Sequence, residues 1–197
     1  MMAHKHQITT GDILPLPEYV KVRGETRKKM AAIKRDRRVD VGSHVTFYFE
    51  NYDTMWMQVQ EMLYIEKGGD EQLQGELESY NPLIPKGREF VATMLIEIED
   101  EIKRARILAT LGHIENTITL IFAGETLAAA PADTAERTTP DGKTSAVHFL
   151  RFSMTDAQAA KFKTAGTQIL FGIAHKNYGH IAVMPEATRA ELAKDLD

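Results

Sequence analysis

The apolar positions of the chain follow two different periods. Around residues 44–50, Val45, Phe47 and Phe49 alternate with more polar positions, which is the two-residue period of a half-buried strand. The segment 90–98 is almost wholly apolar, which indicates a central strand. Leu73 and Leu77 lie four positions apart, the spacing of one helix face.

Capping and breaking residues set the bounds of the predicted elements. The predicted helices cover 18–38, 54–67, 70–79, 100–111, 155–164 and 185–196, and the predicted strands cover 39–50, 90–98, 117–122, 125–130, 144–152, 168–174 and 180–184. The strands at 117–130 form a hairpin around Ala123-Gly124, and a five-residue turn, 175–179, joins the last two. Helices and strands do not alternate strictly, so we predict an α+β fold. Its largely antiparallel mixed sheet carries packed helices, and a helical segment precedes it at the N-terminus.

The length of 197 residues fits a single domain over 1–197. Within it, the strands and helices of 144–197 could pack as a C-terminal subdomain. The segment 131–143 is rich in Pro, Thr, Asp and Ala, and this composition predicts a mobile surface loop.

Missing residue types and motifs exclude several chemistries. The chain has no Cys, so it holds no disulfide, no thiolate nucleophile and no Cys-ligated metal or cluster. No apolar run approaches the length of a membrane span, and no apolar leader is present, so we expect a cytoplasmic protein without membrane contact. A Gly-rich phosphate loop, a G-x-S-x-G elbow and an H-E-x-x-H motif are also missing. The cofactor stays unknown.

Charge is concentrated in one segment. The chain carries a net −4, but 21–38 contains nine basic residues against two acidic ones, so this segment carries +7 and the remainder −11. One interpretation is a solvated face packed against the protein's own carboxylates; others are an acidic protein partner and a nucleic acid or phosphate. The acidic net charge disfavours nucleic acid. The predicted partner-binding basic helix comprises Arg23, Arg27, Lys28, Lys34, Arg35 and Arg38.

Three histidines form a first candidate site. His175 and His180 flank the predicted turn at 175–179, and His148 lies on a strand that could be its neighbour. Three imidazoles at one sheet edge could bind zinc or iron. The alternative is that all three are structural, with Asn177 and Tyr178 stabilising the turn.

A polar group around the helix 54–67 is a second candidate. It comprises Glu50, Asn51, Gln58, Glu61 and Arg151. A buried carboxylate among amides could act as a general base, and with His44 or His148 it could hold a metal. The alternative is a satisfied polar network in which Glu61 accepts hydrogen bonds or pairs with Arg151.

Several strings resemble a bacterial family, domain of unknown function family 3501. They are Glu18-Tyr19, Phe49-Glu50-Asn51, Gln58 to Leu63, Tyr80 to Pro85, Ser145 to Phe152 and His175 to Tyr178. Together they span about residues 10–197. The resemblance implies a role beside rubrerythrin-like and iron–sulfur oxidoreductase proteins. A chain without Cys would be an accessory there and not the electron carrier.

Three hypotheses follow. The favoured one is a non-catalytic accessory or interaction protein of a cytoplasmic redox or iron-linked system, with an acidic or redox protein as partner and a possible homodimer through exposed sheet edges. The alternative is a metal-dependent or small-molecule-binding enzyme that uses a His/Glu cluster, His148, His175, His180 and Glu61. The third, nucleic-acid binding through the basic helix, is disfavoured by the acidic net charge.

Overall fold

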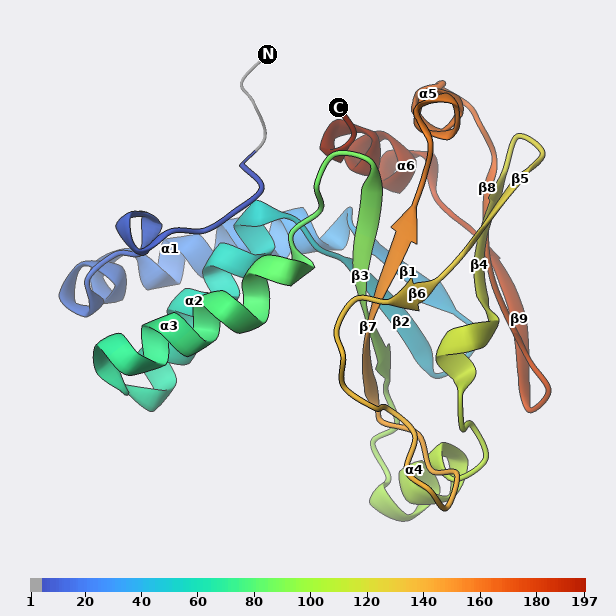
Figure 1. Cartoon of the computed structure of the whole chain (residues 1–197), viewed down its shortest axis with the longest axis horizontal. Helices are drawn as coiled ribbons and strands as arrows, with labels where there is room; N and C mark the ends of the chain where they lie inside the picture. The colour runs from blue at the N-terminus through green and yellow to red at the C-terminus, as the bar shows by residue number, and fades with distance from the viewer. Residues whose placement is uncertain (1–4) are drawn as a thin grey trace.

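The computed structural model describes residues 5–197, so the first four residues of the predicted domain lie outside it. Two antiparallel sheets lie face to face, and a layer of helices stands on the outer side of the first sheet (Figure 1). This layer consists of α1 (Leu16–Arg35), α2 (Tyr52–Glu66) and α3 (Gly69–Tyr80). The arrangement confirms the predicted α+β class, its antiparallel pairing and its N-terminal helix.

The first sheet has the order β1-β2-β3-β7-β6. Its strands are β1 (Arg38–Val41), β2 (Val45–Phe49), β3 (Glu89–Ile96), β7 (Val147–Ser153) and β6 (Ala130–Pro131). The nearly apolar β3 lies in the middle, as its sequence predicts. Side chains on its outer face form rows across neighbouring strands, such as Tyr48, Thr93 and Phe149.

The second sheet has the order β5-β4-β8-β9. Its strands are β5 (Glu125–Ala128), β4 (Ile118–Phe122), β8 (Ile169–His175) and β9 (Tyr178–Val183). The β4–β5 hairpin confirms the turn predicted at Ala123-Gly124. The chain passes from the second sheet to the first between β5 and β6.

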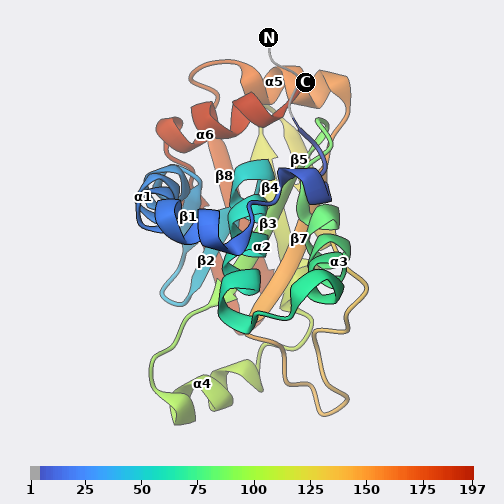
Figure 2. The ribbon, with the colours of Figure 1, turned by 90° about the vertical axis from the view of Figure 1, so that its left-hand side faces the viewer.

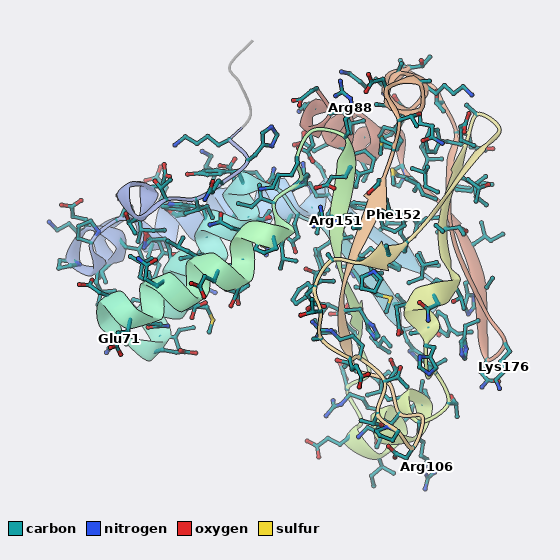
Figure 3. All side chains as sticks on the ribbon, viewed as in Figure 1. Glu71, Arg88, Arg106, Arg151, Phe152 and Lys176 are labelled. Atoms are coloured by element: carbon teal, nitrogen blue, oxygen red, sulfur yellow. The ribbon has the colours of Figure 1, made fainter. Side chains whose placement is uncertain are left out.

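Aromatic side chains fill the space between the sheets. The ring of Phe171 lies 4.3 Å from that of Phe47, 5.9 Å from Phe49 and 5.5 Å from Phe152. Arg151 and Phe152 are adjacent on β7 and lie on opposite faces of the first sheet (Figure 3). The helices pack on the other face through a smaller core that includes Met55, Val59 and Val91.

Short helices close the two ends of the sandwich (Figure 2). At one end lies α4 (Glu101–Leu108), followed by the 3-10 helix η3 (Ile114–Thr117). At the other end lie α5 (Asp156–Lys163) and α6 (Glu186–Leu192). Three further 3-10 helices are η1 (Thr10–Asp12), η2 (Asn81–Leu83) and η4 (Ala193–Asp195).

Three of the differences from the predicted bounds change how the elements connect. The first helix ends at Arg35, so Arg38 belongs to strand β1. The predicted strand 39–50 is a hairpin, because Gly42 takes a φ of 74° and turns the chain between β1 and β2. The turn after β8 is shorter than predicted, since strand pairing continues to His175 and Tyr178.

The segment 131–143 runs beside the edge of β7. The amide of Ala132 donates to the carbonyl oxygen of Phe149 at 2.8 Å, and the amide of Ser145 donates to that of Arg137 at 2.6 Å. The amide of His113 donates to Thr138 Oγ1 at 2.9 Å. These bonds bring the segment against the end of the sandwich; its mobility stays a prediction. The elements after residue 144 divide between both sheets, because β7 pairs with β3 while β8 pairs with β4.

Within residues 5–197, no helix combines the length and the apolar character that crossing a membrane requires.

Candidate functional site

His148 is a polar residue on the core face of β7. Alternate residues of this strand, His148, Leu150 and Phe152, are buried, because successive side chains of a strand point to opposite faces. His148 is 1% exposed and lies at the end of the sandwich near η3. A buried imidazole needs hydrogen-bond partners for both ring nitrogens.

One ring nitrogen of His148 has such partners. Nε2 lies 3.0 Å from the carbonyl oxygen of Ser145 and 3.1 Å from Thr144 Oγ1. A carbonyl oxygen can only accept, so Nε2 carries the proton. Burial lowers the pKa of His148 below its ordinary value, although the Glu115 carboxylate opposes this shift. In the neutral ring, Nδ1 therefore presents a bare lone pair.

That lone pair faces a second acceptor. Glu115 Oε2, on η3, lies 3.6 Å from His148 Nδ1, beyond hydrogen-bond distance. Neither atom has a hydrogen-bond partner. Two buried acceptors that face each other need a donor between them, because an unpaired buried polar atom costs free energy.

Asp133 and Arg137, from the segment after β6, add two more unpaired atoms. An Arg137 terminal nitrogen donates to Asp133 Oδ2, and the guanidinium lies 5.1 Å from the centre of the Phe149 ring. Asp133 Oδ1 and Arg137 Nε have no hydrogen-bond partner. Both side chains are held in place, yet each keeps one polar atom unused.

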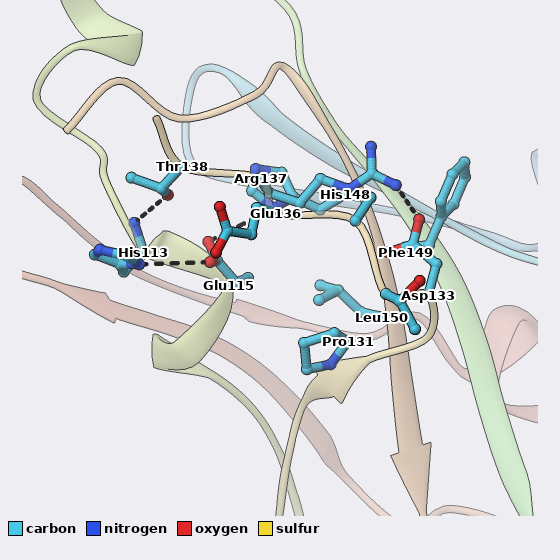
Figure 4. A pocket seen from close by; sticks show the side chains of 12 residues that line it. His113, Glu115, Pro131, Asp133, Glu136, Arg137, Thr138, His148, Phe149 and Leu150 are labelled. Carbon is cyan, nitrogen blue, oxygen red and sulfur yellow. Dashed lines mark hydrogen bonds and ion pairs between the residues drawn. The ribbon is translucent and has the colours of Figure 1, made fainter. Parts of the chain in front are cut away.

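The four residues that carry these unpaired atoms all line one cavity of about 310 Å³, which we name the His148 cavity (Figure 4). In the described part of the chain, no other buried side-chain polar atom lacks a hydrogen-bond partner. The residues that line the His148 cavity are His113, Glu115, Pro131, Asp133, Thr134, Ala135, Glu136, Arg137, Thr138, His148, Phe149 and Leu150. Three of the unpaired atoms are acceptors and one is a donor, so the cavity suits a molecule with several donors.

The three histidines predicted to ligate a metal each make different contacts. His175 Nδ1 accepts a hydrogen bond from the amide of Asn177 at 3.2 Å. The ring of His180 lies 4.4 Å from that of Tyr178, while His148 faces Glu115. Among residues 5–197, no three His, Asp or Glu side chains are grouped as a metal ion requires. The structure does not bring these histidines together as one ligand set.

The predicted polar cluster is divided among several places. Asn51 caps α2 by accepting from the amide of Thr54 at 3.0 Å. Glu61 accepts from Arg23 Nη2 at 2.8 Å, and Arg151 donates to Glu89. Glu50 and Gln58, by contrast, stay together: they line a second cavity of about 480 Å³ beneath the helices, which we name the Glu50 cavity.

The predicted basic helix is also divided. Arg27, Lys28 and Arg35 are exposed on α1. Arg23 is engaged by Glu61 and Lys34 lines the Glu50 cavity. Arg38, beyond the helix, pairs with Asp40 at 2.8 Å. The positive surface of α1 is therefore smaller than the sequence suggests.

Sequence reasoning missed Glu115, Asp133 and Arg137. Asp133 and Arg137 lie in the compositionally biased segment, and Glu115 lies between two predicted elements. One signal was readable: the alternation in 144–152 puts His148 on the same face as Leu150 and Phe152. A histidine on a core face needs a polar partner, but the alternation does not say which residue supplies it.

Comparison with known proteins gives a family and a structure. A family described as "Protein of unknown function (DUF3501)" matches residues 7–196. A crystal structure of a novel protein of unknown function from Burkholderia pseudomallei K96243, at 1.90 Å resolution, is 39% identical in sequence. The similarity covers 97% of this chain and 100% of that chain, with a TM-score of 0.90. No curated protein matches.

Proposed function

This chain belongs to the DUF3501 family of proteins of unknown function, and we propose that it is a ligand-binding protein whose His148 cavity takes a neutral polyhydroxy compound. The family and the Burkholderia protein have no described function, so the proposal rests on the chemistry of the cavity.

The observation that carries the proposal is the concentration of unpaired polar atoms. Buried polar atoms are almost always hydrogen-bonded, and here the four residues that carry unpaired ones, Glu115, Asp133, Arg137 and His148, all line one cavity. A ligand in this cavity has to supply the hydrogen bonds that these atoms lack.

The charges of the lining select the ligand class. Three carboxylates, Glu115, Asp133 and Glu136, stand against one guanidinium, Arg137, so an anionic ligand is disfavoured. A hydroxyl group both donates and accepts. One hydroxyl can donate to His148 Nδ1 and a second to Glu115 Oε2, because each hydroxyl carries a single proton. A third can accept from Arg137 Nε while it donates to Asp133 Oδ1. A volume of about 310 Å³ is at the small end of ligand pockets.

The experiment is an NMR titration of ¹⁵N-labelled protein with glycerol, erythritol and glucose, and with n-propanol and acetate as probes that lack several hydroxyls. We expect saturating shifts of the amides of Asp133–Thr138 and His148 with at least one polyol, and none with acetate. No saturable shift with any polyol would contradict the proposal.

Two variants provide the matched comparison. Glu115→Gln replaces the acceptor opposite His148 and should lower polyol affinity about tenfold, the effect of losing roughly 1.4 kcal/mol. Glu71→Gln removes the same charge from an exposed residue of α3 outside the cavity and should leave the affinity close to wild type. Equal titration curves for Glu115→Gln and wild type would place the binding elsewhere.

A second proposal concerns the exposed face of α1. Only Tyr19 and Met30 of this helix are buried, and the side chains of Arg27, Lys28 and Arg35 face solvent beside exposed Val20. A positive, partly apolar helix on an acidic chain suits an acidic protein partner. That the partner is a redox or iron-linked protein of the cytoplasm is supported by the family resemblance alone.

A pull-down at low and moderate salt tests this second proposal. A partner held by α1 should be lost at moderate salt, because exposed charges are screened. It should also be lost when Arg27, Lys28 and Arg35 are changed to Glu. A partner that survives both changes would contradict docking at α1.

A further inference from the structure

The Glu50 cavity contains a buried carboxylate without a cationic partner. Glu50 is 4% exposed. Its Oε2 accepts from Thr54 Oγ1 and its Oε1 from Thr93 Oγ1, both at 2.6 Å. No Lys, Arg or His nitrogen of the described residues forms an ion pair with it within 4.0 Å. Buried charges are normally paired, and two neutral hydroxyls do not supply a counter-charge.

The nearby guanidinium of Arg37 does not supply it either. Arg37 Nη2 donates to the backbone oxygen of Glu50 at 3.2 Å. Its charge is paired with Asp195 and lies 3.6 Å from Glu191 Oε1. The Glu50 carboxyl group therefore lines the cavity without an ion pair to Arg37.

The rest of the lining is largely apolar and aromatic. Tyr48 and Phe149 belong to one row across the first sheet, and Tyr80 adds a third ring from the end of α3. The remaining lining residues are Lys34, Met55, Gln58, Thr93, Leu95 and Val147. Aromatic rings around a carboxylate attract organic cations, because the ring faces carry partial negative charge.

We infer that the Glu50 cavity binds the ammonium group of a small organic cation, with the Glu50 carboxylate as counter-ion and the rings of Tyr48, Tyr80 and Phe149 lining the site. Lys34, from α1, lines the same cavity, so its ammonium competes with the ligand for this space. A ligand that also carries a carboxylate can pair it with Lys34. The site is separate from the polyol site proposed above, although Phe149 borders both cavities.

The test is isothermal titration calorimetry with n-butylammonium, and with n-butanol and butanoate as the neutral and anionic probes of matched size. We expect n-butylammonium to bind wild-type protein at least tenfold more tightly than n-butanol, and butanoate not to bind. γ-Aminobutyrate, with both charges, tests the role of Lys34: it should bind more tightly than n-butylammonium only while Lys34 is present.

Variants expected to weaken and to strengthen the binding of n-butylammonium make the test more specific. Glu50→Gln should weaken n-butylammonium at least tenfold, and Phe149→Leu should weaken it roughly threefold. Lys34→Gln should strengthen it roughly threefold, because a like charge is removed. Glu78→Gln, which removes an exposed carboxylate of α3, should change nothing, and so should Glu115→Gln in the His148 cavity.

Three results would overturn the inference: no saturable binding of n-butylammonium, equal affinity for n-butanol, or wild-type affinity in a folded Glu50→Gln variant. If Glu50→Gln fails to fold, Lys34→Gln and Phe149→Leu test the inference in its place. Wild-type affinity for n-butylammonium in both of these variants would overturn the inference as well. If the His148 cavity binds no polyol, the expectations for the Glu50 cavity stay the same.

Discussion

His148 is a buried histidine whose two ring nitrogens lie in different surroundings. Nε2 is bonded to the Ser145 carbonyl oxygen, whereas Nδ1 lies 3.6 Å from Glu115 Oε2, beyond hydrogen-bond distance. Burial keeps the ring neutral by lowering its pKa. A neutral, oriented imidazole with a free lone pair is suited to accept a hydrogen bond from a ligand hydroxyl.

This neutral state has a consequence for stability against pH. In the unfolded chain His148 has a pKa near 6.5, and in the folded protein its pKa is lower. Below pH about 6.5 the unfolded state therefore binds the proton first. His148 thus contributes stability above that pH, and the contribution is lost as the pH falls towards the folded pKa, at up to about 1.4 kcal/mol per pH unit.

Urea unfolding at pH 7 and pH 5.5 measures this effect. Between pH 7 and pH 5.5, the free energy of unfolding should decrease more in wild-type protein than in His148→Gln, which has no titrating group at this position. Identical slopes for the two proteins would mean that the folded state accepts the proton as readily as the unfolded state.

At the scale of elements, α1 is held to α2 by one ionic network. Glu61 accepts hydrogen bonds from Tyr19 Oη at 2.6 Å and from Arg23 Nε at 2.8 Å. The Arg23 guanidinium lowers the pKa of Glu61, while burial and the bond to Glu61 raise the pKa of Tyr19. Since α1 buries little apolar surface, this network contributes much of the interaction that holds α1 against α2.

Replacing Glu61 by Gln should therefore loosen α1. Hydrogen bonds to charged groups contribute about 1.5–3 kcal/mol, and a loss of about 2 kcal/mol lowers Tm by roughly 4–8 °C in a chain of this length. Thermal denaturation followed by circular dichroism measures it. Glu25→Gln, on the exposed side of α1, is the control, and equal Tm values for the two variants would contradict this role.

In the molecule as a whole, Arg37 joins the junction of α1 and β1 to η4, which lies close to the C-terminal residue. It follows α1, is 1% exposed and donates to Phe49 O at 2.9 Å. Its guanidinium is bonded to Asp195 in η4. The junction of helix layer and sheet is thus joined to the C-terminal helix.

Asp195→Ala would leave a buried guanidinium with Glu191 as its remaining carboxylate neighbour. Breaking a buried ion pair costs about 3–5 kcal/mol, and we expect the lower end because Glu191 Oε1 stays 3.6 Å away. Chemical denaturation of Asp195→Ala and of Asp70→Ala, which removes an exposed carboxylate of α3, checks this. A loss below about 1 kcal/mol for Asp195→Ala would show that the pair does not stabilise the junction.

The sequence predicts local features better than their assembly. Ala123 and Gly124 mark a tight turn, and both take positive φ values, 47° and 78°, as a short hairpin requires. Gly42 interrupts an apparently continuous apolar strand in the same way, with a φ of 74°. The division into two sheets depends on pairings between distant segments, such as β4 with β8, which no local period encodes.

The candidate site follows the same pattern. His148 could be singled out from its strand, and Glu50 with Gln58 from the start of α2. Glu115 and Arg137 could not, because the end of the sandwich brings together η3 and the segment after β6, two regions without a regular pattern of their own.

The stability of Glu115→Gln decides whether the His148 cavity is shaped for a ligand or for the protein's own stability. A Gln amide can donate to His148 Nδ1, so the variant should unfold at pH 7 with a free energy equal to wild type or up to about 1 kcal/mol higher, while its polyol affinity falls about tenfold. A free energy of unfolding lower than wild type by more than about 1.5 kcal/mol, with polyol binding intact, would show that Glu115 is a structural partner of His148 and would contradict the account.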